Sequence, residues 1–177
     1  MEIAYFGRGR VGSACREVID RLGIEVLGSP DYERASFFIS VHWNEIWNKD
    51  QLSIPKEGCL NLHNSYLPWN KGAHACTWAI VDQTPHGATM HWMDEGVDTG
   101  DIFHRERLQL REDETADELY QRTMELEVKV FKDSMKMLME GKRPRTPQVG
   151  IGSVHRKADF ERLVRAVKTS DCIVVRR

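Results

Sequence analysis

Residues 61–98 read NLHNSYLPWNKGAHACTWAIVDQTPHGATMHWMDEGVD. This stretch is dense in polar groups capable of chemistry, whereas the apolar runs around it are typical of a structural scaffold. Asn61, His63 and Asp98 are the candidate catalytic residues. Asn61 and His63 are two residues apart at the end of an apolar run, so they point to the same side of an extended chain.

An amide beside an imidazole can hold a developing oxyanion while the imidazole moves a proton, which indicates acyl transfer or carbonyl chemistry. A carboxylate such as Asp98 could hold the imidazole and raise its pKa, or accept a proton through water. Ser65 is a candidate nucleophile, but the GxSxG turn that exposes such a serine is absent around it. Taken singly, His63 is also consistent with a buried structural histidine and Asp98 with a loop cap.

Outward from this stretch, hydrophobic periodicity predicts an α/β fold. Strands are expected at 1–6, 24–27, 36–41, 58–62, 88–93, 102–110 and 172–175, and helices at 11–22, 73–81, 115–140 and 160–167. The strand at 36–41 is apolar on both faces and is therefore predicted to be central, whereas 102–110 is polar enough for an edge. Residues 31–35 are too few for a full helical crossover, so that connection must be short or irregular.

The long helix begins with a capping box, in which Thr115 is followed three residues later by Glu118. Its apolar stripe would serve a core or a homodimer interface equally well. The stripe consists of Leu119, Thr123, Leu126, Val130, Ser134 and Met137.

A glycine-rich turn follows the first predicted strand, with Gly7, Gly9 and Gly12 in the spacing GxGxxG. Such a turn can bring a phosphate to a helix N-terminus. The acid that a dinucleotide site needs after the second strand comes late, at Asp31. The sequence therefore favours a tight strand-to-helix turn over a phosphate contact, and both over an NAD(P)-dependent oxidoreductase.

Aromatic side chains follow the predicted central strand, at the end where open α/β sheets bind ligands. Trp43, Ile46 and Trp47 could clamp a flat heterocycle, or they could anchor a helical turn to the core.

Composition limits the class of protein. The 177 residues carry a net charge of −2, so there is no broad basic field to attract nucleic acid. The sequence shows neither a signal peptide nor an apolar run of membrane-spanning length, and we expect a cytoplasmic protein with no membrane association.

Four cysteines, Cys15, Cys59, Cys76 and Cys172, are widely spaced and are expected to be buried thiols. Zinc bound by Cys59, His63, His74 and Cys76 is the alternative, but the spacing lacks a paired CxxC, so we expect no metal.

Several motifs resemble the folate-dependent formyltransferases, whose pattern is N-x-H-P-S-x-L-P, then a glycine, G-x-T-x-H and D-x-G-x-D-x-G. The corresponding segments are 61–68 (NLHNSYLP), Gly72, 87–91 (GATMH) and 94–100 (DEGVDTG). The resemblance covers about residues 41–138 and implies a Rossmann-like formyltransferase sheet with flanking helices, shortened at its N-terminal half. It also implies a catalytic domain at 1–147 and a small C-terminal appendage of helix and strand at 148–177.

The resemblance implies formyl transfer from N10-formyltetrahydrofolate to a primary amine. Asn61 would hydrogen-bond the formyl oxygen, and His63 would stabilise the tetrahedral oxyanion. Asp98 would orient His63 and help to remove the amine proton, while Thr89 and His91 would support the loop holding Asp98. The pterin would lie near Trp43, Ile46, Trp47, Glu95 and Val97.

Within the family, LPWNKG at 67–72 is most similar to the L-P-Y-N-R-G of enzymes that formylate nucleotide-linked amino sugars. This similarity implies a nucleotide-linked amino-dideoxy sugar as the acceptor. The expected acceptor-binding residues are Tyr66, Trp69, Asn70, Lys71 and Gly9.

Two departures from the family pattern are visible: Asn64 replaces a proline, and about one βα unit is missing before Asn61. One alternative is a glycinamide ribonucleotide formyltransferase, although Arg10-Val11 differs from that family's loop. Another is a catalytically weak folate- or nucleotide-binding protein, against which the retention of all three candidate catalytic residues argues. A tRNA substrate is not expected, because the appendage is smaller than the oligonucleotide-binding barrel of methionyl-tRNA formyltransferases.

Overall fold

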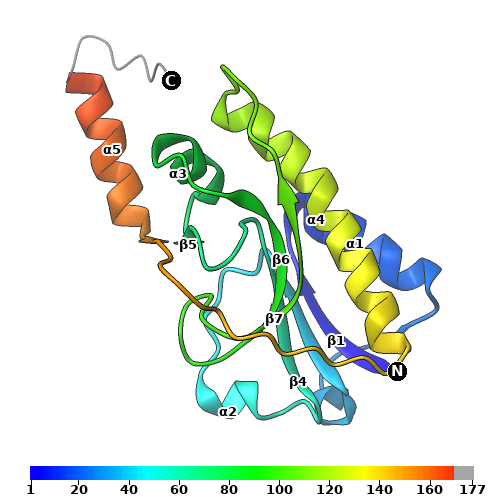
Figure 1. The fold of residues 1–177 in the computed structure, drawn as a ribbon. Helices are drawn as coiled ribbons and strands as arrows, with labels where there is room; N and C mark the ends of the chain where they lie inside the picture. The colour runs from blue at the N-terminus through cyan, green and yellow to red at the C-terminus, as the bar shows by residue number, and fades with distance from the viewer. Residues whose placement is uncertain (170–177) are drawn as a thin grey trace.

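The computed structural model describes residues 1–169, which form a six-stranded sheet flanked by helices (Figure 1). The strand order is β2-β1-β3-β4-β6-β7. The strands are β1 (Glu2–Gly7), β2 (Glu25–Leu27), β3 (Phe37–Val41), β4 (Gly58–His63), β6 (His86–Trp92) and β7 (Ile102–Leu108). The predicted α/β fold class is confirmed.

The sheet is parallel from β2 through β4, and β6 and β7 then pair antiparallel. All five residues of β3 are buried, which confirms that 36–41 is central, and β7 is the edge strand that its polarity predicts. Because β1, β3 and β4 are parallel, their carboxyl ends meet at one edge of the sheet, where α/β proteins place their ligands.

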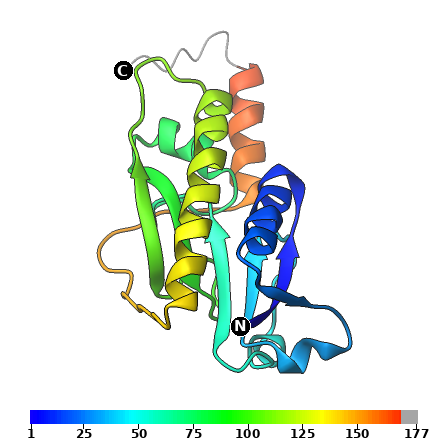
Figure 2. The same cartoon turned by 90° about the vertical axis from the view of Figure 1, so that its right-hand side faces the viewer.

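Two helices, α1 (Gly9–Arg21) and α4 (Ala116–Met139), lie side by side over one face of the sheet (Figures 1 and 2). They enclose the larger apolar core, which includes Ile39, Leu60 and Phe131. Cys15 is buried in this core, while Cys59 and Cys76 are buried elsewhere, so the buried-thiol prediction is confirmed for these three. Cys172 and the predicted strand at 172–175 lie outside the described residues.

The opposite face of the sheet is covered by short elements instead of full crossover helices. The 3₁₀ helix η1 (Asp31–Arg34) links β2 to β3, and the one-turn helix α2 (Lys49–Leu52) lies between β3 and β4. Their neighbourhood buries Phe38 and Trp47 in a second apolar cluster. These short connections, which stand where full crossover helices would be longer, account for the short N-terminal half of the chain.

Helix α4 buries a wider face than the predicted stripe. Leu126 and Met137 are only partly buried, whereas Phe131 and Met135 are fully buried. The reason is that α4 packs against the sheet, α1 and α3 (Ala75–Val81) together. The stripe is thus accounted for by the core of a single chain and no longer argues for a dimer.

The glycine-rich turn is closely packed by the protein itself. A Cβ on Gly12 would lie 2.7 Å from the carbonyl carbon of Gly7, and a Cβ on Gly7 would lie 2.4 Å from the Tyr5 hydroxyl. Tyr5 also donates a 2.6 Å hydrogen bond to the Gly12 carbonyl. These contacts explain two of the three glycines as parts of a tight strand-to-helix turn.

Residues after 147 return to the part of the chain before them. The two-residue strand β8 (Val154–His155) pairs with β5 (Lys71–Gly72), and α5 (Lys157–Thr169) then extends away from the sheet (Figure 1). None of the helices within residues 1–169 combines the length and the apolar character that a membrane crossing needs.

His86 in β6 makes the stability of the fold depend on pH. The side chain is fully buried, and burial, with a contribution from His63, lowers its pKa to about 4. Between pH 6.5 and 4 the unfolded chain therefore binds a proton that the folded chain does not, so stability falls as the pH falls. We expect His86→Gln to reduce the loss of unfolding free energy between pH 6.5 and 5 by about 2 kcal/mol.

Urea unfolding at the two pH values measures this difference. His104→Gln, on the neighbouring strand β7, is the matched control for the loss of one imidazole from a more exposed position. An unchanged pH dependence in His86→Gln would contradict the assignment.

Candidate active site

The three candidate catalytic residues lie together at the carboxyl end of β4. Asp98, on the loop after β6, places Oδ1 3.5 Å from Asn61 Nδ2 and Oδ2 3.6 Å from His63 Nε2. The Nε2–H of His63 donates to the Asn70 carbonyl at 3.0 Å. Strand alternation therefore brings Asn61 and His63 to one side, and the loop supplies the carboxylate.

Asp98 is held as a carboxylate by its surroundings. Burial would raise its pKa, but the charge of His63, contacts with His91 and the Gly72 N–H together hold it well below the usual range. The Gly72 N–H donates to Oδ2 at 2.8 Å. Gln148 fastens the loop itself, because its Nε2 donates to the carbonyls of Asp98 and Gly100, both at 2.8 Å.

His91 connects Asn61 with Asp98. Its Nδ1–H donates to the Trp92 carbonyl at 2.8 Å, which leaves Nε2 facing Asn61 Nδ2 at 3.2 Å and Asp98 Oδ1 at 3.4 Å. In the neutral ring Nε2 can accept from Asn61, and in the protonated ring it can donate to Asp98. This is the position from which His91 would support Asp98.

Thr89 lies elsewhere than the resemblance implies. Its hydroxyl donates to the Ser65 carbonyl at 2.7 Å and accepts from the Leu67 N–H at 3.2 Å. Thr89 therefore stabilises the turn after His63, and not the loop that holds Asp98 as the resemblance implies. Its position follows from the strand register, because Thr89 is opposite His63 in the β4–β6 pair.

A cleft of about 730 Å³ opens above these residues. Its walls come from the segment after β3, the end of β4, the loop after β6 and the residues around β8. The polar and charged lining includes Asn61, His63, His91, Asp98, His42, Glu45, Asp94, Arg156 and Lys157.

Four of the five residues predicted to bind the pterin line the cleft: Trp43, Ile46, Trp47 and Val97. Ile46 and Val97 are exposed apolar side chains at the cleft, while Trp47 is buried against Phe6 and Phe38. Trp47 is therefore also the core anchor that the alternative interpretation describes. Glu95 is exposed on the loop and is not part of the lining.

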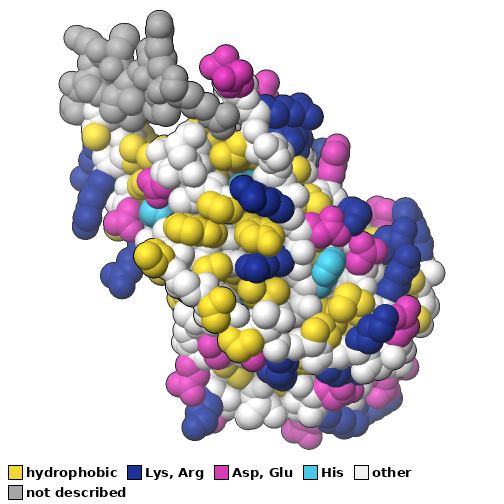
Figure 3. Space-filling view, viewed as in Figure 1, with side chains coloured by type: hydrophobic (Ala, Val, Ile, Leu, Met, Phe, Trp, Pro, Cys, Tyr) yellow, Lys and Arg dark blue, Asp and Glu magenta, His cyan; other side chains and the backbone are white. Residues whose placement is uncertain are grey.

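The residues predicted to bind the acceptor do not line the cleft. The ring of Tyr66 lies under the Arg105 guanidinium at 4.2 Å, and Asn70 is fully buried. Lys71 belongs to β5, and Gly9 begins α1. Tyr66 and Trp69 are half-buried. The face of the molecule seen in Figure 3 carries hydrophobic side chains with Lys and Arg side chains beside them.

Asn70 supports the site through hydrogen bonds to three other residues. Its side chain donates to Thr84 at 2.8 Å and accepts from Ser153 at 2.9 Å, while its own carbonyl holds His63. Asn70 has φ 54°, a left-handed conformation that asparagine tolerates better than most residues. Asn70 therefore supports neighbouring residues of the site and is too buried to offer a surface to the acceptor.

Sequence reasoning missed His42, Arg156 and Lys157, all of which line the cleft. His42 directly follows the central strand, which is a usable signal for a ligand site. Arg156 and Lys157 approach only because β8 pairs with β5, and no local pattern predicts that pairing.

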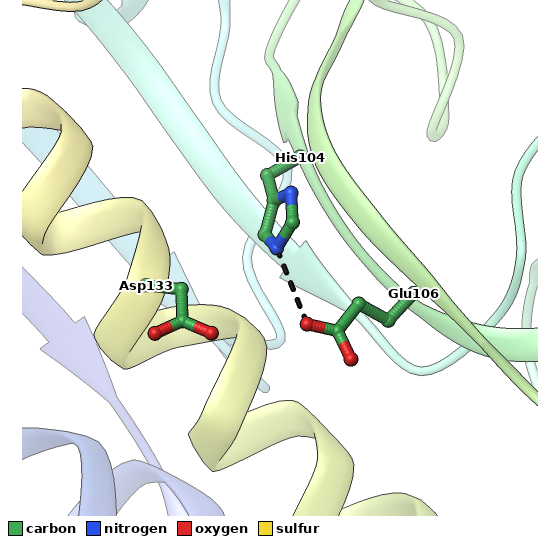
Figure 4. A group of neighbouring side chains, drawn as sticks. All are labelled: His104, Glu106 and Asp133. Atoms are coloured by element: carbon green, nitrogen blue, oxygen red, sulfur yellow. Dashed lines mark ion pairs between the residues drawn. The ribbon is translucent and has the colours of Figure 1, made fainter.

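The structure does not gather Cys59, His63, His74 and Cys76 into a group that could share an ion. Within residues 1–169, the one group of side chains close enough to share an ion is His104, Glu106 and Asp133, on β7 and α4 (Figure 4). Lys129 already forms ion pairs with Glu106 and Asp133. Lys129 therefore balances one of the two carboxylate charges in this cluster, which lies outside the cleft.

Comparison with known proteins identifies a family. Residues 24–135 match the family model described as "Formyl transferase". The methionyl-tRNA formyltransferase of Methylacidiphilum infernorum is 40% identical over 107 residues, which cover 60% of this chain and 33% of that protein. The enzyme of the same name from Agathobacter rectalis is 34% identical over 143 residues, covering 78% of this chain and 46% of its own length. The chain thus spans less than half the length of these curated relatives.

A solved structure matches over nearly the whole of both chains. It is the formyltransferase PseJ from Anoxybacillus kamchatkensis, in complex with UDP-4,6-dideoxy-4-formamido-L-AltNAc and tetrahydrofolate. The two chains are 29% identical, with a TM-score of 0.83, and the match covers 96% of this chain and 93% of PseJ.

Proposed function

Because the chain belongs to the formyl transferase family, we propose that it transfers a formyl group from N10-formyltetrahydrofolate to the primary amine of a nucleotide-linked amino-dideoxy sugar. The observation that carries the proposal is the cluster of Asn61, His63 and Asp98 at the base of a cleft of about 730 Å³.

The choice of an amino sugar is supported by the likeness to PseJ, which extends over nearly the whole of both chains. PseJ, solved with a UDP-linked formamido sugar, matches 96% of this chain, including the region around β8 that walls the cleft. The 67–72 motif, LPWNKG, points to the same acceptor class. A cytoplasmic location and a homodimer stay predictions.

The residues of the cleft meet the needs of this reaction. The Asn61 amide would donate to the formyl oxygen, which gains negative charge as the amine attacks, and His63 would stabilise the same charge. A carboxylate with a depressed pKa is a weak base. The main contribution of Asp98 is therefore electrostatic: it orients His63 and His91, and it stabilises the positive charge that forms on the amine nitrogen during attack on the formyl carbon, until that nitrogen loses its proton.

The cleft also fits the folate donor. Trp43, Ile46 and Val97 offer an apolar surface for a flat ring, and Trp43 Nε1 is a buried donor with no hydrogen-bond partner among residues 1–169. When bound, the donor supplies an activated formyl group. These side chains would bind it and exclude water, which would otherwise compete with the amine.

The test is mass spectrometry of UDP- and dTDP-linked amino sugars after incubation with the protein and N10-formyltetrahydrofolate. We expect a formyl mass increment on one sugar that requires the donor. Glycinamide ribonucleotide and initiator methionyl-tRNA are run alongside. Formylation of either, with none of the sugars, would contradict the proposed acceptor.

Trp43→Ala should separate the donor site from the acceptor site. The Trp43 ring is tilted by 59° to that of Phe6, and the Arg8 guanidinium lies 4.4 Å from the Trp43 ring centroid. Loss of this surface is expected to raise the KM for the folate by about tenfold and the KM for the acceptor much less. Steady-state kinetics with each substrate varied in turn measures the effect. A larger change in the acceptor KM would place the folate elsewhere.

A further inference from the structure

A carboxyl group lies where an apolar side chain would be expected. Glu127 is in the middle of α4, on the face that also buries Val130 and Phe131, and its exposed fraction is 0%. Burying a carboxylate is costly unless a partner compensates it. One oxygen, Oε2, has no hydrogen-bond partner among residues 1–169, so the compensation comes through Oε1.

The partner of Glu127 is His42, whose Nε2–H donates to Oε1 at 2.6 Å. His42 directly follows β3 and has φ 52°, a backbone conformation that residues other than glycine rarely adopt. Glu127 does not line the cleft, whereas His42 does. The pair therefore connects the core face of α4 with the ligand side of the sheet.

The pair favours a charged imidazole. Burial would lower the pKa of His42, but the hydrogen bond and the charge of Glu127 more than compensate, so the pKa is raised above 6.5. Behind the pair, burial raises the pKa values of Cys15 on α1, Cys76 on α3 and Tyr120 on α4, and the negative charge of Glu127 raises them further. The charged or titratable groups lining the cleft are Glu45, His63, His91, Asp94, Asp98, His155, Arg156 and Lys157.

The second ring nitrogen of His42 is available. Among residues 1–169, Nε2 has Glu127 as its partner, and Nδ1 makes no hydrogen bond and is not a buried unsatisfied atom. A protonated imidazole donates from both nitrogens. With Nε2 fixed by Glu127, Nδ1–H is a charged donor that has no partner among the described residues.

We propose that His42 is a ligand-binding residue of the cleft, held as an imidazolium by Glu127, and that its Nδ1–H binds an electron-rich oxygen of the ligand. That oxygen is a carbonyl or carboxylate of the folate, or a phosphate of the nucleotide. The identity of these ligands rests on the proposed function, whereas the charge on His42 does not.

The first measurement needs no ligand. Imidazole NMR follows the titration of His42 in the full chain, in wild type and in Glu127→Gln. We expect His42 to titrate above pH 6.5 in wild type and at a clearly lower pH in Glu127→Gln, with both proteins folded. Equal titration curves, or a wild-type value at or below 6.5, would overturn the charged pair.

The second measurement is calorimetric binding of tetrahydrofolate and of UDP, each between pH 6 and 9. His42→Asn is the informative variant, because asparagine tolerates the left-handed backbone and cannot be protonated. We expect it to weaken one of the two probes about tenfold at pH 6 and to remove the loss of affinity at high pH. The probe that weakens identifies the source of the oxygen.

Glu45→Gln is the matched control, since it also changes one charge in the wall of the cleft. It should leave the wild-type dependence on pH in place. If His42→Asn binds both probes as wild type does, His42 is not a ligand-binding residue, even where sugar formylation proceeds. If wild type binds neither probe, the proposed function and the ligand contact both fall, while the NMR titration still decides the charged pair.

Discussion

Asp98→Asn is expected to lower kcat for formyl transfer by about a thousandfold while leaving the fold intact. The carboxylate lies between His63 and His91, and the two imidazoles help to hold it ionised. An amide in its place keeps the shape but removes the charge that orients the imidazoles and stabilises the positive charge forming on the amine nitrogen.

Asparagine is the appropriate replacement because Asp98 has φ 53°, a conformation that asparagine also adopts, and its amide oxygen can still accept from the Gly72 N–H. A single-turnover assay measures the chemical step, and calorimetric binding of tetrahydrofolate checks that the cleft is intact. Near-wild-type kcat in Asp98→Asn would show that the charge is not part of the reaction.

Local sequence pattern is sufficient for some of this site. Asn61 and His63 are placed correctly because strand alternation is a property of neighbouring residues, and β4 covers both. The contact of Asn61 with Asp98 spans 37 residues, so it is predicted by the motif resemblance and not by periodicity. The same limit explains Thr89, whose partner depends on how β6 is aligned with β4.

Pairings across long stretches of chain could not be predicted. Glu127 looks like a solvent-facing residue of an amphipathic helix, and it faces inward because α4 packs against three neighbours at once. Ser153 reaches Asn70 across 83 residues, and Gln148 reaches Asp98 across 50. Both come from an irregular segment with no hydrophobic period, so the sequence predicts an appendage where the structure shows a support for the loop that carries Asp98.

Because residues after 147 help to hold Asp98, we expect Gly72→Ala, in the strand that pairs with β8, to have a large effect on both stability and kcat. Gly72 has φ +88°, and a Cβ there would lie 2.3 Å from the His155 carbonyl oxygen in the paired strand β8. Its N–H also donates to Asp98. We expect about 3 kcal/mol of lost stability from backbone strain and the broken pairing. We also expect at least a tenfold fall in kcat, because a hydrogen bond to a charged group is lost.

Gly150→Ala separates strain from contact. Gly150 has φ +90°, nearly the same as Gly72, but a Cβ there would meet nothing within 4 Å. This variant should lose only the roughly 1–2 kcal/mol of left-handed strain and keep the wild-type kcat. Urea unfolding and kcat of the folded protein, measured for both variants, compare the two effects. If Gly72→Ala lost stability but kept full kcat, the β5–β8 pairing would stabilise the chain without positioning Asp98.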